Sequence, residues 1–117
     1  MKDFKELEMW KRSHQLTLEI YKATQNFPKE ELFGLTSQIR RAVSSIPTNI
    51  AEGCGRRTNA ELANFLNIAS GSASEVEYEL ILAKDLEYIS AEQQDQWNRE
   101  VSEIRSMLAA YMKALKS

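Results

Sequence analysis

Six polar residues in the middle of the chain recur every three or four positions and carry groups that bind partners through hydrogen bonds and ion pairs. They are Gln38, Arg41, Ser45, Asn49, Glu52 and Arg56. On a helix this spacing places them in one row, here named the polar seam. Amide, hydroxyl, guanidinium and carboxylate groups in a row favour binding over bond-breaking chemistry. The seam therefore predicts contact with a partner.

A row of apolar residues lies beside the polar seam in the same predicted helix and indicates a core face. Its members are Ile39, Ala42, Val43, Ile46 and Ile50. Pro47 lies between the two rows, lacks a backbone N–H and costs about 3 kcal/mol in a regular helix interior. We expect Ser44, Thr48 or Asn49 to hydrogen-bond the carbonyl that Pro47 leaves free and to fix a kink.

Two compatible interpretations of the polar seam follow. In the structural one, Arg41 and Glu52 pair with neighbouring helices, and the residues that serve structure or assembly are Gln38, Arg41, Ser45, Pro47, Asn49 and Glu52. In the functional one, the seam contacts another copy of the chain or a phosphate backbone. The residues for which we predict nucleic-acid contact are Arg40, Arg41, Arg56 and Arg57.

The other reactive side chains do not form a catalytic or metal-binding constellation. A di-iron bundle needs Glu-x-x-His pairs on two helices, and zinc needs several His or Cys ligands, but His14 and Cys54 are the only histidine and cysteine. We predict a structural role for Cys54 and an edge-of-core position with one hydrogen bond for His14. We therefore predict no enzyme, no metal and no cofactor.

Three glutamates alternate along the third predicted helix. Glu75, Glu77 and Glu79 are two positions apart, so they fan around a helix axis and do not converge. We expect them to lie on a solvated or intersubunit face.

Four helical segments are predicted to position these residues. The first runs from Phe4 or Leu7 to Asn26, and the second runs from the first turn at Pro28 to about Cys54. The third and fourth begin at capping-box sequences, with a small-residue patch in the middle of the third. The boxes and the patch are Thr58 with Glu61, Ser90 with Gln93, and residues 70–74. The prediction is an all-α, antiparallel up-down-up-down four-helix bundle.

Length and composition fit this architecture. The 117 residues form one predicted domain, 1–117, with 43% hydrophobic and 27% charged residues. No apolar run approaches the roughly 18 residues of a membrane span. The first residues mix charges among apolar positions, unlike a signal peptide. We therefore predict a cytoplasmic protein without membrane contact.

The charge is unevenly distributed along the chain. The formal net charge is −2, with ten Lys/Arg against seven Asp/Glu in residues 1–58 and five against ten in residues 59–117. An antiparallel bundle with this pattern presents one basic and one acidic face, or simply solvated helix surfaces that differ.

The sequence resembles the 23S rRNA-intervening-sequence protein family from end to end. The residues that carry the resemblance are Trp10 with His14 and Leu16, Tyr21, Phe27 with Pro28, residues 34–38, 40–42, 45–47 and 49–53, Arg56, residues 69–72, and Glu75. The resemblance implies a four-helix bundle that assembles as a ring-like homopentamer, is encoded in some bacteria inside 23S rRNA gene insertions, and has no established enzymatic activity. A related branch, the accessory variability protein of diversity-generating retroelements, forms a basic pentameric barrel that binds nucleic acid and the reverse transcriptase.

These observations lead to one expected function and two alternatives. We expect a non-enzymatic homo-oligomer, pentameric by resemblance, with a role in binding RNA or other nucleic acid. The first alternative is a scaffold or adaptor that binds protein without touching nucleic acid. The second is a hydrolase or nuclease, which would need a carboxylate cluster built across subunits.

Overall fold

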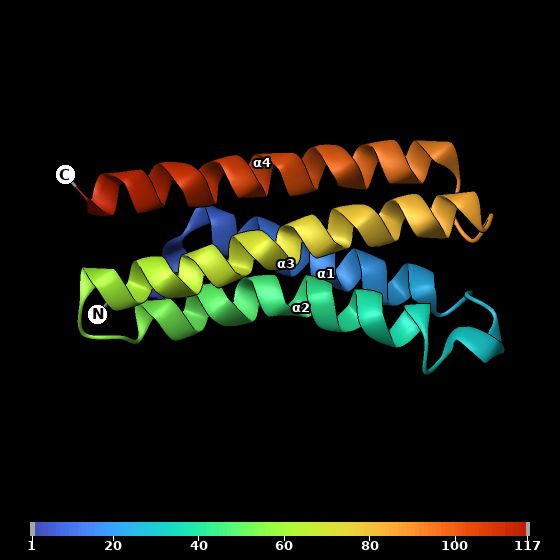
Figure 1. The fold of residues 1–117 in the computed structure, drawn as a ribbon, viewed down its shortest axis with the longest axis horizontal. Helices are drawn as coiled ribbons and strands as arrows, with labels where there is room; N and C mark the ends of the chain where they lie inside the picture. Colours follow the sequence, from blue (N-terminus) through green and yellow to red (C-terminus); the bar gives the residue numbers. More distant parts are fainter. Residues whose placement is uncertain (1, 117) are drawn as a thin grey trace.

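The computed structural model describes residues 2–116, which form four long helices (Figure 1). The long helices are α1 (Glu8–Thr24), α2 (Leu35–Cys54), α3 (Asn59–Asp85) and α4 (Ala91–Leu115). Short 3₁₀ turns, Phe4–Glu6 and Lys29–Glu31, precede α1 and α2. No strand occurs between residues 2 and 116. The predicted all-α class is confirmed.

Each helix packs against its neighbours in the chain, and α4 returns to α1 (Figure 1). Hydrogen bonds between neighbouring helices advance along one helix as they go back along the other, as in an antiparallel arrangement. On α1 and α2, Thr24 bonds Arg40, whereas the earlier Thr17 bonds Val43. On α1 and α4, Glu19 bonds Trp97, whereas the earlier Arg12 bonds Glu100. The molecule extends 45 × 23 × 20 Å, consistent with an elongated up-down-up-down bundle.

The apolar row of α2 forms the centre of the core. All five of its residues are buried, and Val43, Ile46 and Ile50 have no measurable exposure. They meet apolar residues from every other long helix, including Leu16, Ile20, Leu66, Leu80, Ile104 and Leu108. The predicted core face of this helix is confirmed.

The second helix begins later than the sequence suggested. We predicted a start in the first turn at Pro28, but Gly34 has φ −111° and ψ −116°, which separates the turn Lys29–Glu31 from α2. The side chain of Glu31 then accepts a hydrogen bond from the Leu35 N–H at 3.2 Å and satisfies a free amide at the new helix start. The continuous helix was therefore a wrong prediction.

Local caps define the starts of α3 and α4. The Thr58 hydroxyl accepts from the Glu61 N–H at 3.1 Å. Ser90 and Gln93 form a complete capping box, in which each side chain accepts from the other residue's backbone N–H. Both predicted starts are confirmed.

Helix α2 continues through Pro47, which is buried. The carbonyl of Val43, four positions earlier, accepts a hydrogen bond from the Thr17 hydroxyl of α1 at 3.2 Å. Ser44 and Asn49 instead bond the carbonyls of Arg40 and Ser45, each at 2.8 Å. Our expectation of a donor within α2 was therefore wrong, because a neighbouring helix supplies it.

Candidate functional site

The polar seam opens into a groove between α2 and α3. The groove has a volume of about 630 Å³, is here named the seam groove, and is lined by Gln38, Arg41, Ala42, Ser45, Ser72 and Glu75. The hydroxyls of Ser45 and Ser72 are 2.8 Å apart across it. The amide of Asn49 donates to the Ser45 hydroxyl at 2.9 Å. The middle of the predicted seam is thus one hydrogen-bonded network between two helices.

The charged residues of the polar seam do not pair with neighbouring helices. Glu52 pairs with Arg56 one turn further along the chain, at 3.1 Å, and Arg56 also lies over the ring of Phe65 at 4.8 Å. The exposed guanidinium of Arg41 makes no hydrogen bond or ion pair with any residue in the range 2–116. The expected intrachain pairing of Arg41 and Glu52 with other helices is therefore wrong.

The four arginines predicted to contact nucleic acid do not form a single patch. Arg40 is held against α1, where it donates to the Thr24 hydroxyl at 2.8 Å and to the Tyr21 carbonyl at 3.2 Å. Its guanidinium also lies 4.9 Å from the centre of the Tyr21 ring. The end of α2 at Cys54, just before Arg56, lies fourteen residues or about 21 Å further along the helix axis than Arg40. Arg40 thus braces the bundle.

Arg56 and Arg57 instead join lysines from two other parts of the chain at one end of the bundle. The N–H of Lys2 donates to the Cys54 carbonyl at 3.3 Å, and the Lys2 ammonium lies 5.9 Å from the centre of the Tyr111 ring. Figure 1 shows the α2–α3 turn and the last turn of α4 at this end. We name the set the basic end; its residues are Lys2, Arg56, Arg57, Lys113 and Lys116.

The carboxylates near the basic end are engaged locally. Asp3 accepts from the backbone of Lys5, and Glu61 accepts from the Thr58 hydroxyl at 3.0 Å. Glu52 is paired with Arg56. Sequence reasoning identified the two arginines but not their specific lysine neighbours, because those lie more than fifty positions away along the chain on either side.

The glutamates of α3 do not share one solvated face. Glu77 pairs with Arg105 of α4 at 3.0 Å, whereas Glu79 is only 3% exposed and its Oε1 atom has no hydrogen-bond partner among the described residues. Burial, the charge of Glu75 and a hydrogen bond with it raise the pKa of Glu79 to about 7. We expected the three glutamate side chains to point away from one another, and this was wrong for Glu75 and Glu79 because they are one helical turn apart.

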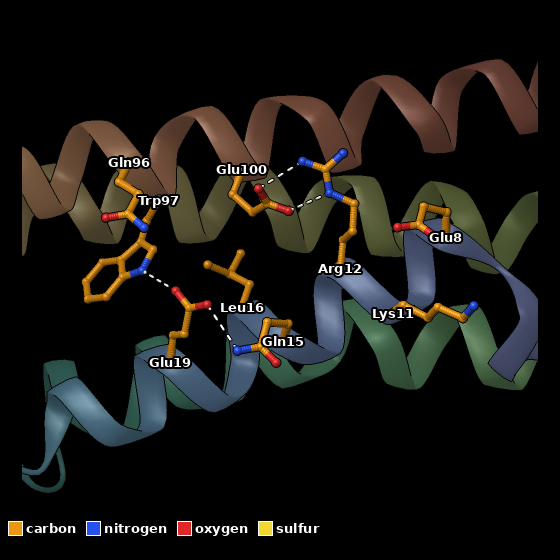
Figure 2. Close-up of a pocket in the computed structure, with 9 residues that line it drawn as sticks. All are labelled: Glu8, Lys11, Arg12, Gln15, Leu16, Glu19, Gln96, Trp97 and Glu100. Atoms are coloured by element: carbon orange, nitrogen blue, oxygen red, sulfur yellow. Dashed lines mark hydrogen bonds and ion pairs between the residues drawn. The ribbon is translucent and has the colours of Figure 1, made fainter.

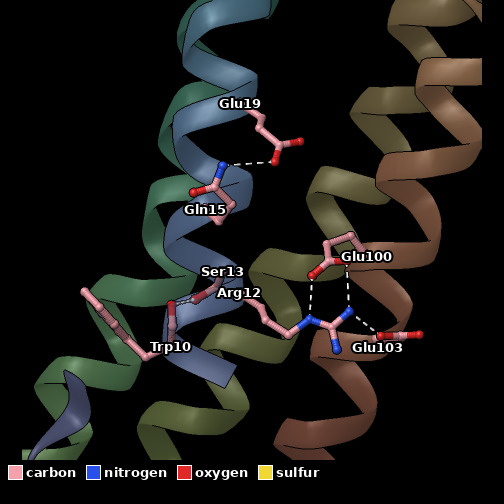
Figure 3. A network of polar contacts seen from close by, with 7 residues as sticks. All are labelled: Trp10, Arg12, Ser13, Gln15, Glu19, Glu100 and Glu103. Atoms are coloured by element: carbon pink, nitrogen blue, oxygen red, sulfur yellow. Dashed lines mark hydrogen bonds and ion pairs between the residues drawn. The ribbon is translucent and has the colours of Figure 1, made fainter. Parts of the chain in front are cut away.

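A second polar pocket lies between α1 and α4, and several of the charged groups that line it pair with one another (Figure 2). Arg12 donates to both oxygens of Glu100 at 2.7 and 2.9 Å and also pairs with Glu103 (Figure 3). The indole of Trp97 donates to Glu19 at 3.1 Å. Because these charged groups satisfy one another, the pocket acts as a brace between the helices.

Neither Cys54 nor His14, the only cysteine and histidine of the sequence, forms a catalytic site. Cys54 is buried, and burial raises the pKa of its thiol, which suits the predicted structural role. His14 is exposed and stacks on Trp10 at 5.0 Å, without a side-chain hydrogen bond to residues 2–116. The predicted histidine hydrogen bond is therefore wrong.

Two further findings concern metal ligands and membrane spans in the described part of the chain. Within residues 2–116, no group of three or more His, Cys, Asp or Glu side chains is arranged to hold a metal ion. None of the helices in this range combines the length and the hydropathy needed to cross a bilayer.

The chain has a clear family relationship and a close structural relative. A crystal structure of a protein of unknown function from the S23 ribosomal protein family of Bacteroides thetaiotaomicron superposes with a TM-score of 0.83 and 32% identity, covering 90% of this chain and 95% of that one. A search of curated proteins found no match. Residues 5–110 match the family described as 23S rRNA-intervening sequence protein. The chain therefore belongs to the 23S rRNA-intervening sequence protein family.

Proposed function

We propose that this protein is a non-enzymatic homo-oligomer, pentameric as the resemblance implies, and that it binds RNA through its basic end. The observation that carries the proposal is the gathering of Arg56 and Arg57 with lysines from the beginning and end of the chain. Guanidinium and ammonium groups are the protein groups that bind phosphate backbones most strongly. Five cationic side chains against the three nearby carboxylates leave this end with an excess of positive charge in a chain of net charge −2.

Assembly increases the effect of a small basic end. In a ring with parallel bundle axes, every copy presents this end on the same face, so several modest phosphate contacts act together. The negative net charge of the remaining surface opposes non-specific coating of nucleic acid. We therefore expect binding that depends on both the oligomer and the basic end.

A titration of fluorescent structured RNA tests the proposed interface. We expect the double substitution Arg56→Ala with Arg57→Ala to weaken binding and to reduce the slope of log affinity against log salt by roughly two, about one per lost phosphate contact. The matched control is Lys22→Ala with Lys29→Ala, which removes the same charge from exposed positions toward the other end. Equal affinities and slopes for all three proteins would contradict the proposal.

The protein-scaffold alternative is supported by a different observation. Phe33 is 93% exposed in the turn before α2, and a large apolar side chain in this position is available to a protein partner. An intact oligomer that binds no structured RNA even at low salt would favour the scaffold and refute RNA binding.

A further inference from the structure

The outward side of α3 combines exposed apolar residues with a glycine that the isolated chain does not need. Ile68, Gly71, Glu75 and Tyr78 follow one another at helical spacing, and Ile68 and Tyr78 are 46% and 60% exposed. A Cβ added at Gly71 would meet nothing within 4 Å. Glycine is unfavourable in a helix interior, and close approach of another molecule would account for its presence here.

A buried, incompletely satisfied carboxyl group lies beside this surface. Glu79 is 3% exposed, its Oε1 atom has no partner among the described residues, and its carboxyl group shares a hydrogen bond with Glu75. Glu75 in turn lines the seam groove. The opposite wall offers Gln38 and Arg41, but no cation of residues 2–116 forms an ion pair with either glutamate. Glu75 is exposed and is therefore the member of the pair that a donor from outside the chain can reach.

The charge pattern of the protein identifies the donor. Residues 59–117, which include this surface, carry five Lys/Arg against ten Asp/Glu, whereas residues 1–58 carry ten against seven. The acidic half of one copy is thus complementary to the basic half of another. The carboxylates at the same place would repel a phosphate backbone, which separates this surface from the basic end.

We propose that the α3 face formed by Ile68, Gly71, Glu75 and Tyr78 docks a second copy of this chain. The second copy places a guanidinium or ammonium group from its residues 1–58 against the carboxyl pair of Glu75 and Glu79. A contact between unlike halves is heterologous, which is the kind that closes a ring by rotation. This inference rests on the proposed homo-oligomer and assigns the surface and the chemistry that hold it together.

Sedimentation over a range of protein concentrations tests the face through Gly71→Leu. The side chain has open space in the single chain, so the variant retains its helical circular dichroism and cooperative melting. In the assembly it occupies the place of the neighbouring copy, and we expect the dissociation constant to rise on the order of tenfold or more. The control is Ala109→Leu, a similar enlargement at an exposed position of α4, which we expect to retain the oligomeric mass of the wild type.

Glu79→Gln tests the carboxyl pair with little change in shape. It removes a negative charge that the second copy would neutralise, so we expect weaker assembly with unchanged helix content. The control is Asp95→Asn, which removes the same charge at an exposed position of α4 and is expected to leave the oligomeric mass unchanged.

The outcomes separate the two proposals. An oligomeric wild type whose mass is unaffected by both Gly71→Leu and Glu79→Gln overturns this inference and leaves the proposed homo-oligomer standing. A wild type that remains a single 13.4 kDa chain at every concentration overturns the homo-oligomer itself.

Discussion

At the residue scale, the Thr17 hydroxyl determines how Pro47 is accommodated in α2. Its one proton is shared between the Ser13 carbonyl at 2.7 Å and the Val43 carbonyl at 3.2 Å, the carbonyl that would otherwise accept from residue 47. A buried carbonyl without a donor loses free energy relative to its hydrated state. The cost of the proline is thus offset by tertiary structure.

Thr17→Val tests this arrangement because it keeps the shape of the side chain and removes the donor. We expect a loss of about 1–2 kcal/mol in the free energy of unfolding, measured by urea denaturation. In a Pro47→Ala background the loss is smaller, because the backbone N–H that this substitution restores supplies the missing hydrogen bond. Equal losses in the two backgrounds would show that Thr17 stabilises α1 alone.

The carboxyl group of Glu79 predicts a pH dependence of stability. Its pKa rises from 4.5 to about 7 on folding, so the folded chain binds its proton more tightly than the unfolded chain. The resulting stabilisation is fully present below pH 4.5, declines as the pH rises, and is lost above about 7. A shift of this size corresponds to at most about 3 kcal/mol.

Comparison with Glu79→Gln isolates this contribution from those of the other carboxylates. In the Gly71→Leu background, at protein concentrations below its raised dissociation constant, the Glu79→Gln variant gains stability relative to its parent as the pH rises from about 5 to about 8. Chemical denaturation at the two pH values measures the difference. An unchanged difference between them would mean that Glu79 is as readily ionised in the folded chain as in water.

Burial that follows from helical periodicity could be predicted from the sequence, whereas contacts that depend on the position of a neighbouring helix could not. The row from Ile39 to Ile50 is buried as predicted, because a helix with one apolar face has only one stable orientation in a bundle. The burial of Glu79 and the bond from Thr17 were missed, because each depends on helix positions that the spacing of residues in one segment does not specify.

At the element scale, Gly53 sets the close approach of α2 and α3. A Cβ at this position would lie 2.9 Å from both Leu62 Cδ1 and Phe65 Cβ, closer than real contacts allow. Gly53→Ala is expected to cost about 1–3 kcal/mol in unfolding free energy because the helices must separate. Gly55→Ala is the control, since Gly55 has an ordinary φ of −84° and the heavy atom nearest to an added Cβ would be 3.5 Å away. A harmless Gly53→Ala would contradict the close packing.

The element boundaries show which sequence signals are sufficient to predict where a helix begins. The caps at Thr58 and Ser90 were predicted correctly, because a cap is formed by residues three positions apart. The reciprocal half of the capping box forms only at Ser90, because the Glu61 side chain accepts from the Thr58 hydroxyl and not from its N–H. The break at Gly34 was missed, because apolar periodicity continues across it and the compensating Glu31 side chain acts only after the turn has formed. Only the two arginines of the basic end were predicted, since the packing of the four helices is what brings its lysines to the same end of the bundle as Arg56 and Arg57.

At the scale of the whole molecule, two surfaces of opposite character divide the proposed functions. The α3 face is apolar and acidic and suits another copy of the chain, whereas the basic end suits phosphate. The two surfaces share no residue, so substitutions can change one without changing the other. The family relationship is established by the sequence match, while the assembly and the RNA contact are proposals.

The most direct test of the account is the mass of the protein in sedimentation, alone and with a fluorescent structured RNA, at about 150 mM salt. We predict a single species several times heavier than the 13.4 kDa chain, which takes up the RNA label as an intact assembly. A single chain that never carries the label at any protein concentration would contradict both the assembly and the RNA-binding role.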